Sequence, residues 1–220
     1  MPMNLEIYNT LRERILYLEY DPGQILKEQS LAKEFGVSRT PLRTVLFRLE
    51  WEHLVKILPR TGIQVMELEL NTITNVFQAR LELEAVIGTM AAERFTNLHL
   101  NQLDACLISC DNHLNHKDPK ALAILDMDIK QLFYEAAGNP FLIEMSDRLY
   151  SLTFRLWYFN MCKADNEGWN QEVVAIKEDL TDLAGLLPTA APDQVGKARR
   201  EHLLKHLKRI RSKFLGLSGL

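Results

Sequence analysis

Arginine and hydroxylated side chains recur at helical spacing in the segment SRTPLRTVLFRLE, residues 38–50. Arginine presents paired N–H donors that match the acceptors on a guanine edge, and threonine can contact a phosphate or a thymine methyl group. A helix with both types on one face fits the major groove of DNA. An amphipathic helix with an ordinary solvated face is the alternative, because a short motif is only a hypothesis. The candidate contact residues are Ser38, Arg39, Thr40, Arg43, Thr44 and Arg48.

Two helices and a tight turn are predicted to position this face. Leu31 and Phe35 form the apolar side of a short first helix, and Gly36 ends it by supplying the backbone freedom of a tight turn. Ser38 is placed to cap the second helix with its hydroxyl group, and Pro41 falls in the first turn, where a missing N–H costs little. The second helix is expected to bury Leu42, Val45, Leu46 and Leu49, and to leave Phe47 outside with the arginines and threonines.

A β-hairpin with a basic tip is predicted directly after the second helix, in HLVKILPRTGIQVMEL, residues 53–68. Behind a recognition helix such a hairpin is a wing, and its tip residues Arg60, Thr61 and Gly62 can approach a phosphate or the minor groove. A plain connecting hairpin is the alternative. A further helix from about Leu5 to Tyr20 precedes the motif. Residues 1–68 are therefore predicted to form a winged helix-turn-helix domain.

The composition shows where the basic residues lie and argues against a membrane protein. The net charge is −3. The segment from Arg39 to Arg60 nevertheless contains five basic residues and two acidic ones, so the positive charge is concentrated locally. No apolar run approaches the length that a bilayer requires, and no signal peptide is seen, so we expect a cytoplasmic protein without membrane contact. The three cysteines lack metal-ligand or redox spacing and are expected to be reduced and mostly buried.

The rest of the chain, residues 69–220, is predicted to be an all-helical second domain, an antiparallel bundle of six to seven helices. The fold class is therefore mainly α, with a small β-hairpin in the first domain. Apolar periodicity predicts helices at Asn71 to Thr96, Leu100 to His116, Pro119 to Ala137, Pro140 to Ala164, Gly168 to Leu187 and Pro192 to Phe214.

The segment from residue 11 to residue 65 resembles the GntR-type bacterial transcription regulators. The motifs that carry the resemblance are PG, FGVSRTPLR, RLE and PRTGIQV. The resemblance implies a homodimer in which Arg39, Arg43 and Gly62 contact double-stranded operator DNA, with Thr40 and Arg48 as helpers. The family often has glutamate and alanine after the second arginine, where this chain has Thr44 and Val45. Operator preference is expected to differ accordingly.

The second domain resembles the C-terminal ligand-binding domain of the FadR-like branch, known as the FCD domain. QARLELEAVIGTMAAERF matches its opening signature, and FYEAAGNPFL matches a later segment in shortened form. This resemblance implies a helical bundle that dimerises and changes operator affinity when a small organic acid or acyl compound enters its core.

Many members of this branch hold a divalent metal with one aspartate and three histidines, and here the chain departs from the family. Lys130 and Tyr134 stand at two ligand positions, and a third position aligns with Asp179 or Leu180. His202 clearly remains. An ammonium group would repel a metal ion in a low-dielectric pocket, so we expect no family-type metal site and no cofactor. A weaker alternative is a metal site made by Asp126, His202 and His206, of which the histidines lie one turn apart.

Without the metal, an acidic effector needs another positive charge. We hypothesise that Lys130 and Arg80 bind the carboxylate of an effector inside the bundle. The alternative is a structural salt bridge from Lys130 to Asp179 or Glu84. The candidate effector residues are Arg80, Glu84, Lys130, Tyr134, Asp179 and His202.

The expected function is a sequence-specific DNA-binding transcription regulator, a repressor relieved by an effector. A DNA-binding architectural or partner-responsive protein whose bundle only dimerises is the alternative. An enzyme is not expected, because no nucleophile–base arrangement and no glycine-rich phosphate loop are present.

Overall fold

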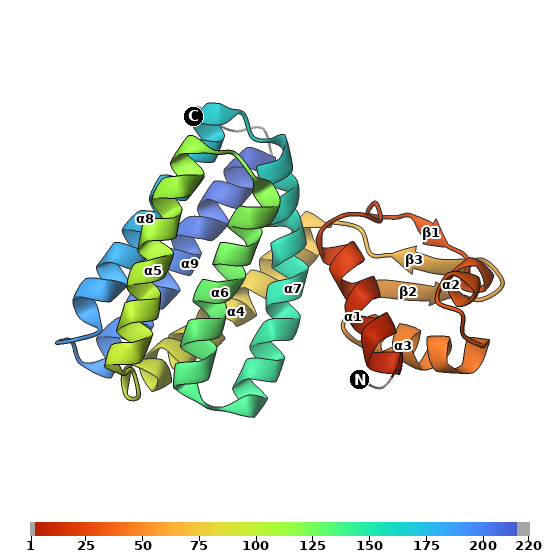
Figure 1. Cartoon of the computed structure of the whole chain (residues 1–220), viewed down its shortest axis with the longest axis horizontal. Helices are drawn as coiled ribbons and strands as arrows, with labels where there is room; N and C mark the ends of the chain where they lie inside the picture. The colour runs from red at the N-terminus through yellow and green to blue at the C-terminus, as the bar shows by residue number, and fades with distance from the viewer. Residues whose placement is uncertain (1–2, 215–220) are drawn as a thin grey trace. The chain divides into compact units, whose positions relative to one another are not determined.

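The structure is a computed structural model that describes residues 3–214, apart from the side chains of residues 70, 213 and 214 (Figure 1). The chain divides into two compact units: residues 1–74 with 151–156, and residues 75–150 with 157–220. The domain boundary between residues 68 and 69 remains a prediction. The helices and strands are α1 (Met3–Leu16), β1 (Ile25–Leu26), α2 (Glu28–Glu34), α3 (Arg39–Trp51), β2 (Val55–Leu58), β3 (Gly62–Val65), α4 (Leu70–Ala92), α5 (Asn97–Asn115), α6 (Pro119–Ala137), α7 (Pro140–Lys163), α8 (Asn166–Leu186) and α9 (Pro192–Phe214).

The first unit is the predicted winged helix-turn-helix, with one strand more than expected. Its antiparallel sheet has the order β1-β3-β2. The hairpin β2-β3 pairs Val55 with Val65 and Leu58 with Gly62, and β1 adds Leu26 opposite Ile63. The sequence did not predict β1, because two residues are too few to show an alternating pattern. Helix α3 contacts both α1 and β2, so the sheet and α1 hold α3 from two sides.

The three helices of this unit end in the same way, with a residue in the left-handed region. Leu18, Gly36 and His53 have φ values of 57°, 64° and 59°. In each case the amide of the next residue donates to a carbonyl five residues back, as Leu54 does to Leu49. Gly36 confirms the predicted stop of α2. The prediction for α1 was wrong at its end, because Leu18 turns the chain and α1 stops at Leu16.

Ser38 occupies the predicted N-cap position of α3, but its side chain makes no capping hydrogen bond. The expectation that its hydroxyl caps the helix was therefore wrong. The hydroxyl is left available on an exposed part of the surface.

Gly62, the first residue of β3, is required by the sheet. It has φ 141°, and a Cβ at this position would lie 2.4 Å from the backbone oxygen of Leu26. Only glycine lets β1 approach the wing this closely. The residue therefore has a structural role beside the DNA contact that the family resemblance implies.

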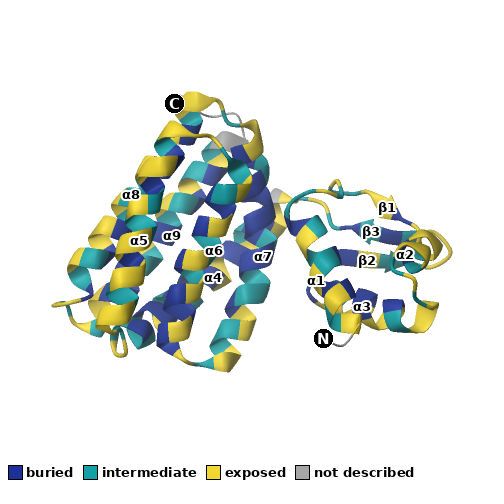
Figure 2. Cartoon of the chain, viewed as in Figure 1, coloured by how far each residue is buried: buried dark blue, intermediate teal, exposed yellow. Residues whose placement is uncertain are grey.

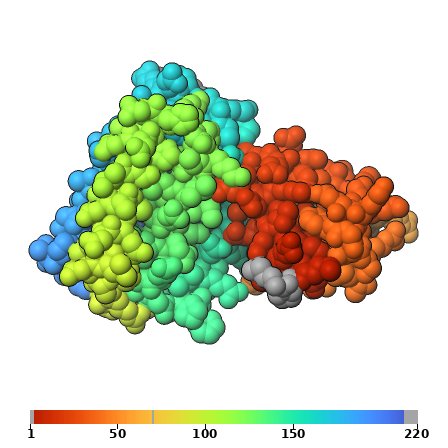
Figure 3. All heavy atoms as spheres, in the orientation of Figure 1, coloured from red at the N-terminus to blue at the C-terminus, as the bar shows by residue number. Residues whose placement is uncertain are grey.

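The second unit is the predicted helical bundle, formed by α4 to α9 among the described residues. Buried residues line the inward helix faces and exposed ones the outward faces (Figure 2). In the space-filling view α5 and α6 lie against each other, in line with their contacts (Figure 3). Of the cysteines only Cys110 is buried, and Cys162 is exposed, so the expectation of mostly buried thiols was wrong. None of the described helices combines the length and apolar character needed to cross a membrane.

Two glycines bring α9 close to α4. A Cβ at Gly196 would lie 2.5 Å from the backbone oxygen of Ala85, and one at Gly88 would lie 3.1 Å from the Cα of Gly196. This close packing places the side chain of Arg199 beside Gly88 and in contact with Glu84, which lies one helical turn before Gly88 on α4.

Replacing Gly62 by alanine is expected to lower the free energy of unfolding of the first unit by about 4 kcal/mol, because backbone strain adds to the clash with Leu26. Gly36→Ala is the matched control: φ is positive there too, but nothing lies within 4 Å of the added Cβ. It should cost about 1–2 kcal/mol. Urea unfolding of the whole protein, followed by circular dichroism, measures both, and equal losses would contradict the close-approach argument.

Candidate nucleic-acid interface and buried bundle site

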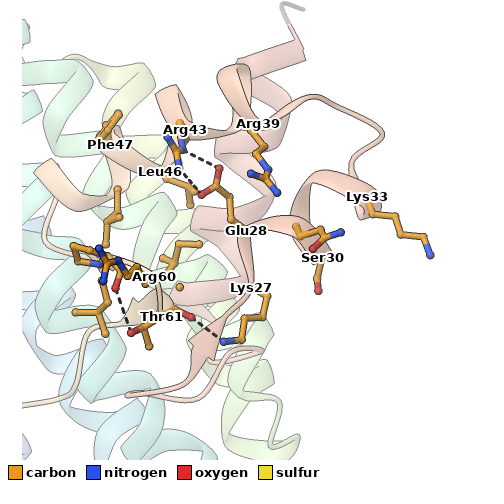
Figure 4. Close-up of a pocket in the computed structure, with 16 residues that line it drawn as sticks. Lys27, Glu28, Ser30, Lys33, Arg39, Arg43, Leu46, Phe47, Arg60 and Thr61 are labelled. Atoms are coloured by element: carbon orange, nitrogen blue, oxygen red, sulfur yellow. Dashed lines mark hydrogen bonds and ion pairs between the residues drawn. The ribbon is translucent and has the colours of Figure 1, made fainter.

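A hollow of about 740 Å³ opens between α2, α3 and the wing (Figure 4). Five of its lining residues are cations, and one, Glu28, is an anion, so the hollow is strongly positive. Leu46 and Phe47 add apolar surface from α3. The cations are Lys27, Lys33, Arg39, Arg43 and Arg60.

Most of the predicted DNA-contact residues line this hollow, and the others lie outside it. Arg39, Arg43, Arg60, Thr61 and Gly62 line it. The hydroxylated residues Ser38, Thr40 and Thr44 are exposed but outside its lining. The role of each in DNA contact remains a prediction.

Arg48 is engaged within the protein. Its guanidinium carbon lies 3.7 Å from the centroid of the Tyr8 ring, and its Nε lies 3.3 Å from Glu52. Arg48 therefore packs against α1, which spacing along α3 alone did not indicate.

Arg43 is held by Glu28, a residue that the sequence reasoning missed. The Nε of Arg43 donates to Oε1 of Glu28 at 2.8 Å, and Nη2 donates to Oε2 at 3.2 Å. These hydrogen bonds raise the pKa of Arg43 above its ordinary value. The two parallel bonds fix the plane of the guanidinium group at the rim of the hollow. The acidic residue Glu28 could be seen in the sequence as a possible partner, but no spacing rule connects a residue of α2 with one of α3.

The wing tip is a tight turn with an unusual residue at its third position. Thr61 donates its amide to the Leu58 carbonyl at 3.1 Å, with Pro59 second and Arg60 third. Arg60 has φ 65°, where glycine or asparagine is preferred. Lys27 donates to the Thr61 carbonyl at 2.8 Å and so ties the tip to the start of α2. An arginine is thus kept at the tip despite its backbone cost.

The second unit contains a buried ionic network centred on Glu84, which is 2% exposed. Arg199 pairs with one carboxylate oxygen, and Arg80 lies 3.7 Å from the other. Tyr134 and Ser146 donate to the same oxygen at 3.2 and 3.0 Å. Burial alone would raise the pKa of Glu84, but Arg199 and Arg80 outweigh it and hold the pKa below its ordinary value. Glu84 is therefore an ionised, fully bonded carboxylate.

Arg199 was missed by the sequence reasoning, although it makes the shortest contact to Glu84. The two residues are 115 positions apart, and only the close packing of α9 on α4 brings them together. Arg80, Glu84 and Tyr134, which were predicted, do lie together.

Lys130 pairs with Asp147 of the next helix, at 2.5 Å. The predicted alternative, a salt bridge to Asp179 or Glu84, was therefore wrong about the partner. The ammonium group also lies 4.0 Å from the centroid of the Tyr150 ring. The side chain of Lys130 is 11% exposed and that of Asp147 is 40% exposed, so the pair opens toward solvent on the aspartate side.

Asp179 and His202, two further candidates, lie together between α8 and α9, away from the Glu84 contacts. The Nε2 of His202 lies 2.9 Å from Asp182 and 3.6 Å from Asp179. Its Nδ1 is buried without a hydrogen-bond partner. Asp182 was not predicted, but it lies one turn beyond Asp179.

The weaker metal alternative is not supported by the geometry. Asp126 accepts from Tyr150, His202 faces Asp182, and His206 lies 3.1 Å from the buried Glu172. In the described part of the chain no three His, Cys, Asp or Glu side chains are placed to hold a metal ion. The residues at the family's metal positions do not fit a divalent ion either, because Lys130 brings a positive charge and the Tyr134 hydroxyl is bonded to Glu84.

Two family descriptions match the chain. Residues 4–65 match the gntR family of bacterial regulatory proteins, and residues 75–205 match the FCD domain. The HTH-type transcriptional repressor RspR of Escherichia coli strain K12 is 24% identical over 210 residues, 96% of this chain and 90% of RspR. An HTH-type regulator from an unstable DNA locus of Streptomyces ambofaciens is 44% identical over 64 residues, 29% of this chain and 27% of that protein.

Solved structures show the same fold. The structure of E. coli McbR/YncC covers 97% of this chain with a TM-score of 0.81 at 20% identity, and 99% of that chain is covered. A regulator described as GntR from Rhodococcus sp. RHA1 covers 96% of this chain with a TM-score of 0.74 at 15% identity, with 99% of that chain covered.

Glu84→Gln is expected to destabilise the helical unit by about 3–5 kcal/mol at pH 7, because it leaves the buried Arg199 without the carboxylate with which it pairs. Since the pKa of Glu84 is lowered in the folded state, its contribution is present above the ordinary value of 4.5 and lost as pH falls through the folded pKa. The difference between wild type and variant should therefore shrink in acid. Thermal melting at pH 7 and pH 3 measures it.

Glu82→Gln is the matched control on the same helix, since the Glu82 side chain is 70% exposed and pairs with Arg200 at the surface. It should change stability little at either pH. A pH dependence in Glu84→Gln as steep as that of the wild type would argue against the network.

Proposed function

Since the chain belongs to the gntR family of bacterial regulatory proteins, with an FCD domain after its helix-turn-helix, we propose that this transcription regulator is a repressor controlled by an effector. The effector would be a small organic acid or acyl compound bound in the helical unit, and its binding would release operator DNA. The name of the relative RspR, a transcriptional repressor, supports the sign of regulation. A homodimer in the cytoplasm, with two recognition helices on a palindromic operator, completes the proposal.

The observation that carries the DNA-binding part is the cationic hollow between α2, α3 and the wing. Its cations come from α2 and the residue before it, from α3 and from the wing tip, and they border one concave surface. A surface of this kind attracts the phosphates of a duplex, while the arginines of α3 face its bases.

Lys130 is the proposed contact for the effector's acidic group. Its present partner, Asp147, is a half-exposed carboxylate on a neighbouring helix, and a ligand carboxylate could replace that partner without leaving a buried anion unpaired. The rings of Tyr134 and Tyr150 beside the ammonium group would form an apolar wall. A role in effector binding remains a prediction for Arg80 and Glu84, which belong to the Glu84 network, and for Asp179 and His202, which lie together between α8 and α9.

We further propose that no divalent metal takes part. The geometry at Lys130 and Tyr134 supports this, because the first carries a positive charge and the second already donates to Glu84.

One observation favours the second candidate, a bundle that only dimerises. Arg199 and Arg80 already pair with Glu84, a carboxylate of the chain itself, so these arginines have an anionic partner without a ligand acid. In that case the protein would respond to a partner, not to a small molecule.

Arg60→Gly should separate fold from DNA binding. It removes the strain of a positive φ and should raise stability by about 1 kcal/mol. It also removes a cation from the hollow, so the slope of log affinity against log salt should fall by about 0.9 for the lost phosphate contact. Fluorescence anisotropy with a 30-base-pair duplex over a salt series measures this without knowledge of the operator.

Lys56→Ala is the matched control for that experiment, since Lys56 is an exposed cation on β2 of the same wing but does not line the hollow. Its salt slope should stay close to that of the wild type. Equal slopes for wild type and Arg60→Gly would remove the wing tip from the interface.

Native mass spectrometry of the protein purified without added ligand tests the effector and the metal together. We expect a dimer with an adduct of organic mass, and no metal-sized increment. Lys130→Met should lose the adduct, because the point charge is gone, while Lys177→Met, which removes a surface lysine paired with Asp111, should keep it. A bare dimer in the wild type would favour the second candidate, and a metal increment would overturn the proposal of metal loss.

A further inference from the structure

Phe47 is a large aromatic side chain that the fold does not need in its core. It is 59% exposed, whereas Leu42, Val45, Leu46 and Leu49 of the same helix are at most 3% exposed. The inward face of α3 is therefore complete without it. The exposed phenyl ring offers apolar contact surface among the arginines and threonines of the same helix.

The surroundings of Phe47 identify that partner as DNA. The side chain lines the cationic hollow together with Arg39 and Arg43 of its own helix and with residues of the wing (Figure 4). A surface that presents five lysine and arginine side chains against one glutamate is complementary to a polyanion. A protein partner with an apolar contact patch would have to bury these cations as well.

Phe47 can make one kind of base contact. A phenyl ring has no hydrogen-bonding group, and in the major groove thymine alone among the four bases presents an apolar methyl group. Phe47 follows Arg43 by one helical turn, about 6 Å along the axis, which corresponds to about two base pairs. Both residues lie on α3, so the helix itself sets the spacing between the two side chains.

We propose that Phe47 reads the C5 methyl group of a thymine that lies within about two base pairs of the guanine read by Arg43. Each half-site of the operator then contains a guanine and a thymine at this spacing. This inference rests on the proposed function of the hollow as the DNA-binding surface.

Selection from a duplex library with a randomised centre tests the inference without a known operator. Duplexes are selected in parallel with the wild type, with Phe47→Ala and with Phe47→Leu. Each enriched duplex is then synthesised again with deoxyuridine in place of single thymines. The wild type should enrich a thymine at fixed spacing from a guanine and lose about fourfold in affinity when that thymine lacks its methyl group. Phe47→Ala should lose both the preference and the penalty, and Phe47→Leu should keep part of each.

Trp51→Ala is the matched control, because Trp51 is 58% exposed one turn further along α3 but does not line the hollow. It should select the wild-type motif with the same deoxyuridine penalty. Thermal melts establish that every variant is folded.

Two results would overturn the inference while leaving DNA binding intact: a wild-type motif that tolerates deoxyuridine everywhere, or an unchanged motif in Phe47→Ala. If Phe47→Ala alters the dimer in sedimentation but not the motif, Phe47 belongs to a protein contact and the inference is wrong. Failure of the wild type to enrich any sequence would instead refute the proposed function of the hollow.

Discussion

The approach of the Leu26 carbonyl to Gly62 is the constraint on which the cationic hollow depends. Strand β1 leads directly into α2, so pairing β1 with β3 fixes the start of α2 relative to the wing. Lys27, between the strand and the helix, then reaches the wing tip through the Thr61 carbonyl. A Cβ at position 62 would push β1 away and widen the distance between α2 and the wing. The hollow therefore depends on Gly62 having no side chain.

The helical unit depends on a comparable close approach with a different result. Gly88 and Gly196 let α9 lie near α4, and this contact places Arg199 against Glu84. Arginine side chains from α4 and α9 thus bring positive charge into the bundle core, and Glu84 of α4 pairs with both of them.

Much of this structure could be predicted from the sequence because its signals are local. Pro119, Pro140 and Pro192 stand at helix starts, and Gly36 and Gly138 at helix ends, so the predicted bounds lie within a few residues of those observed. What could not be predicted is pairing between elements. Glu28 with Arg43, Glu84 with Arg199 and Lys130 with Asp147 are each set by how helices pack, and no spacing rule specifies them. Strand β1 was missed for the same reason, since its pairing with β3, and not its own pattern, defines it.

Burial orders these three ion pairs by how readily a ligand can exchange them. The Arg43–Glu28 pair is exposed, so a guanine edge or a phosphate can take over the arginine at little cost. The Arg199–Glu84 pair is nearly inaccessible, and separating it would leave a buried charge without a partner. Lys130 with Asp147 lies between these cases, with a buried cation and a half-exposed anion. An entering acid can therefore displace Asp147 into solvent, whereas it cannot displace Glu84. If the bundle responds to an acidic ligand, we propose that the exchange occurs at Lys130 and leaves the Glu84 network intact.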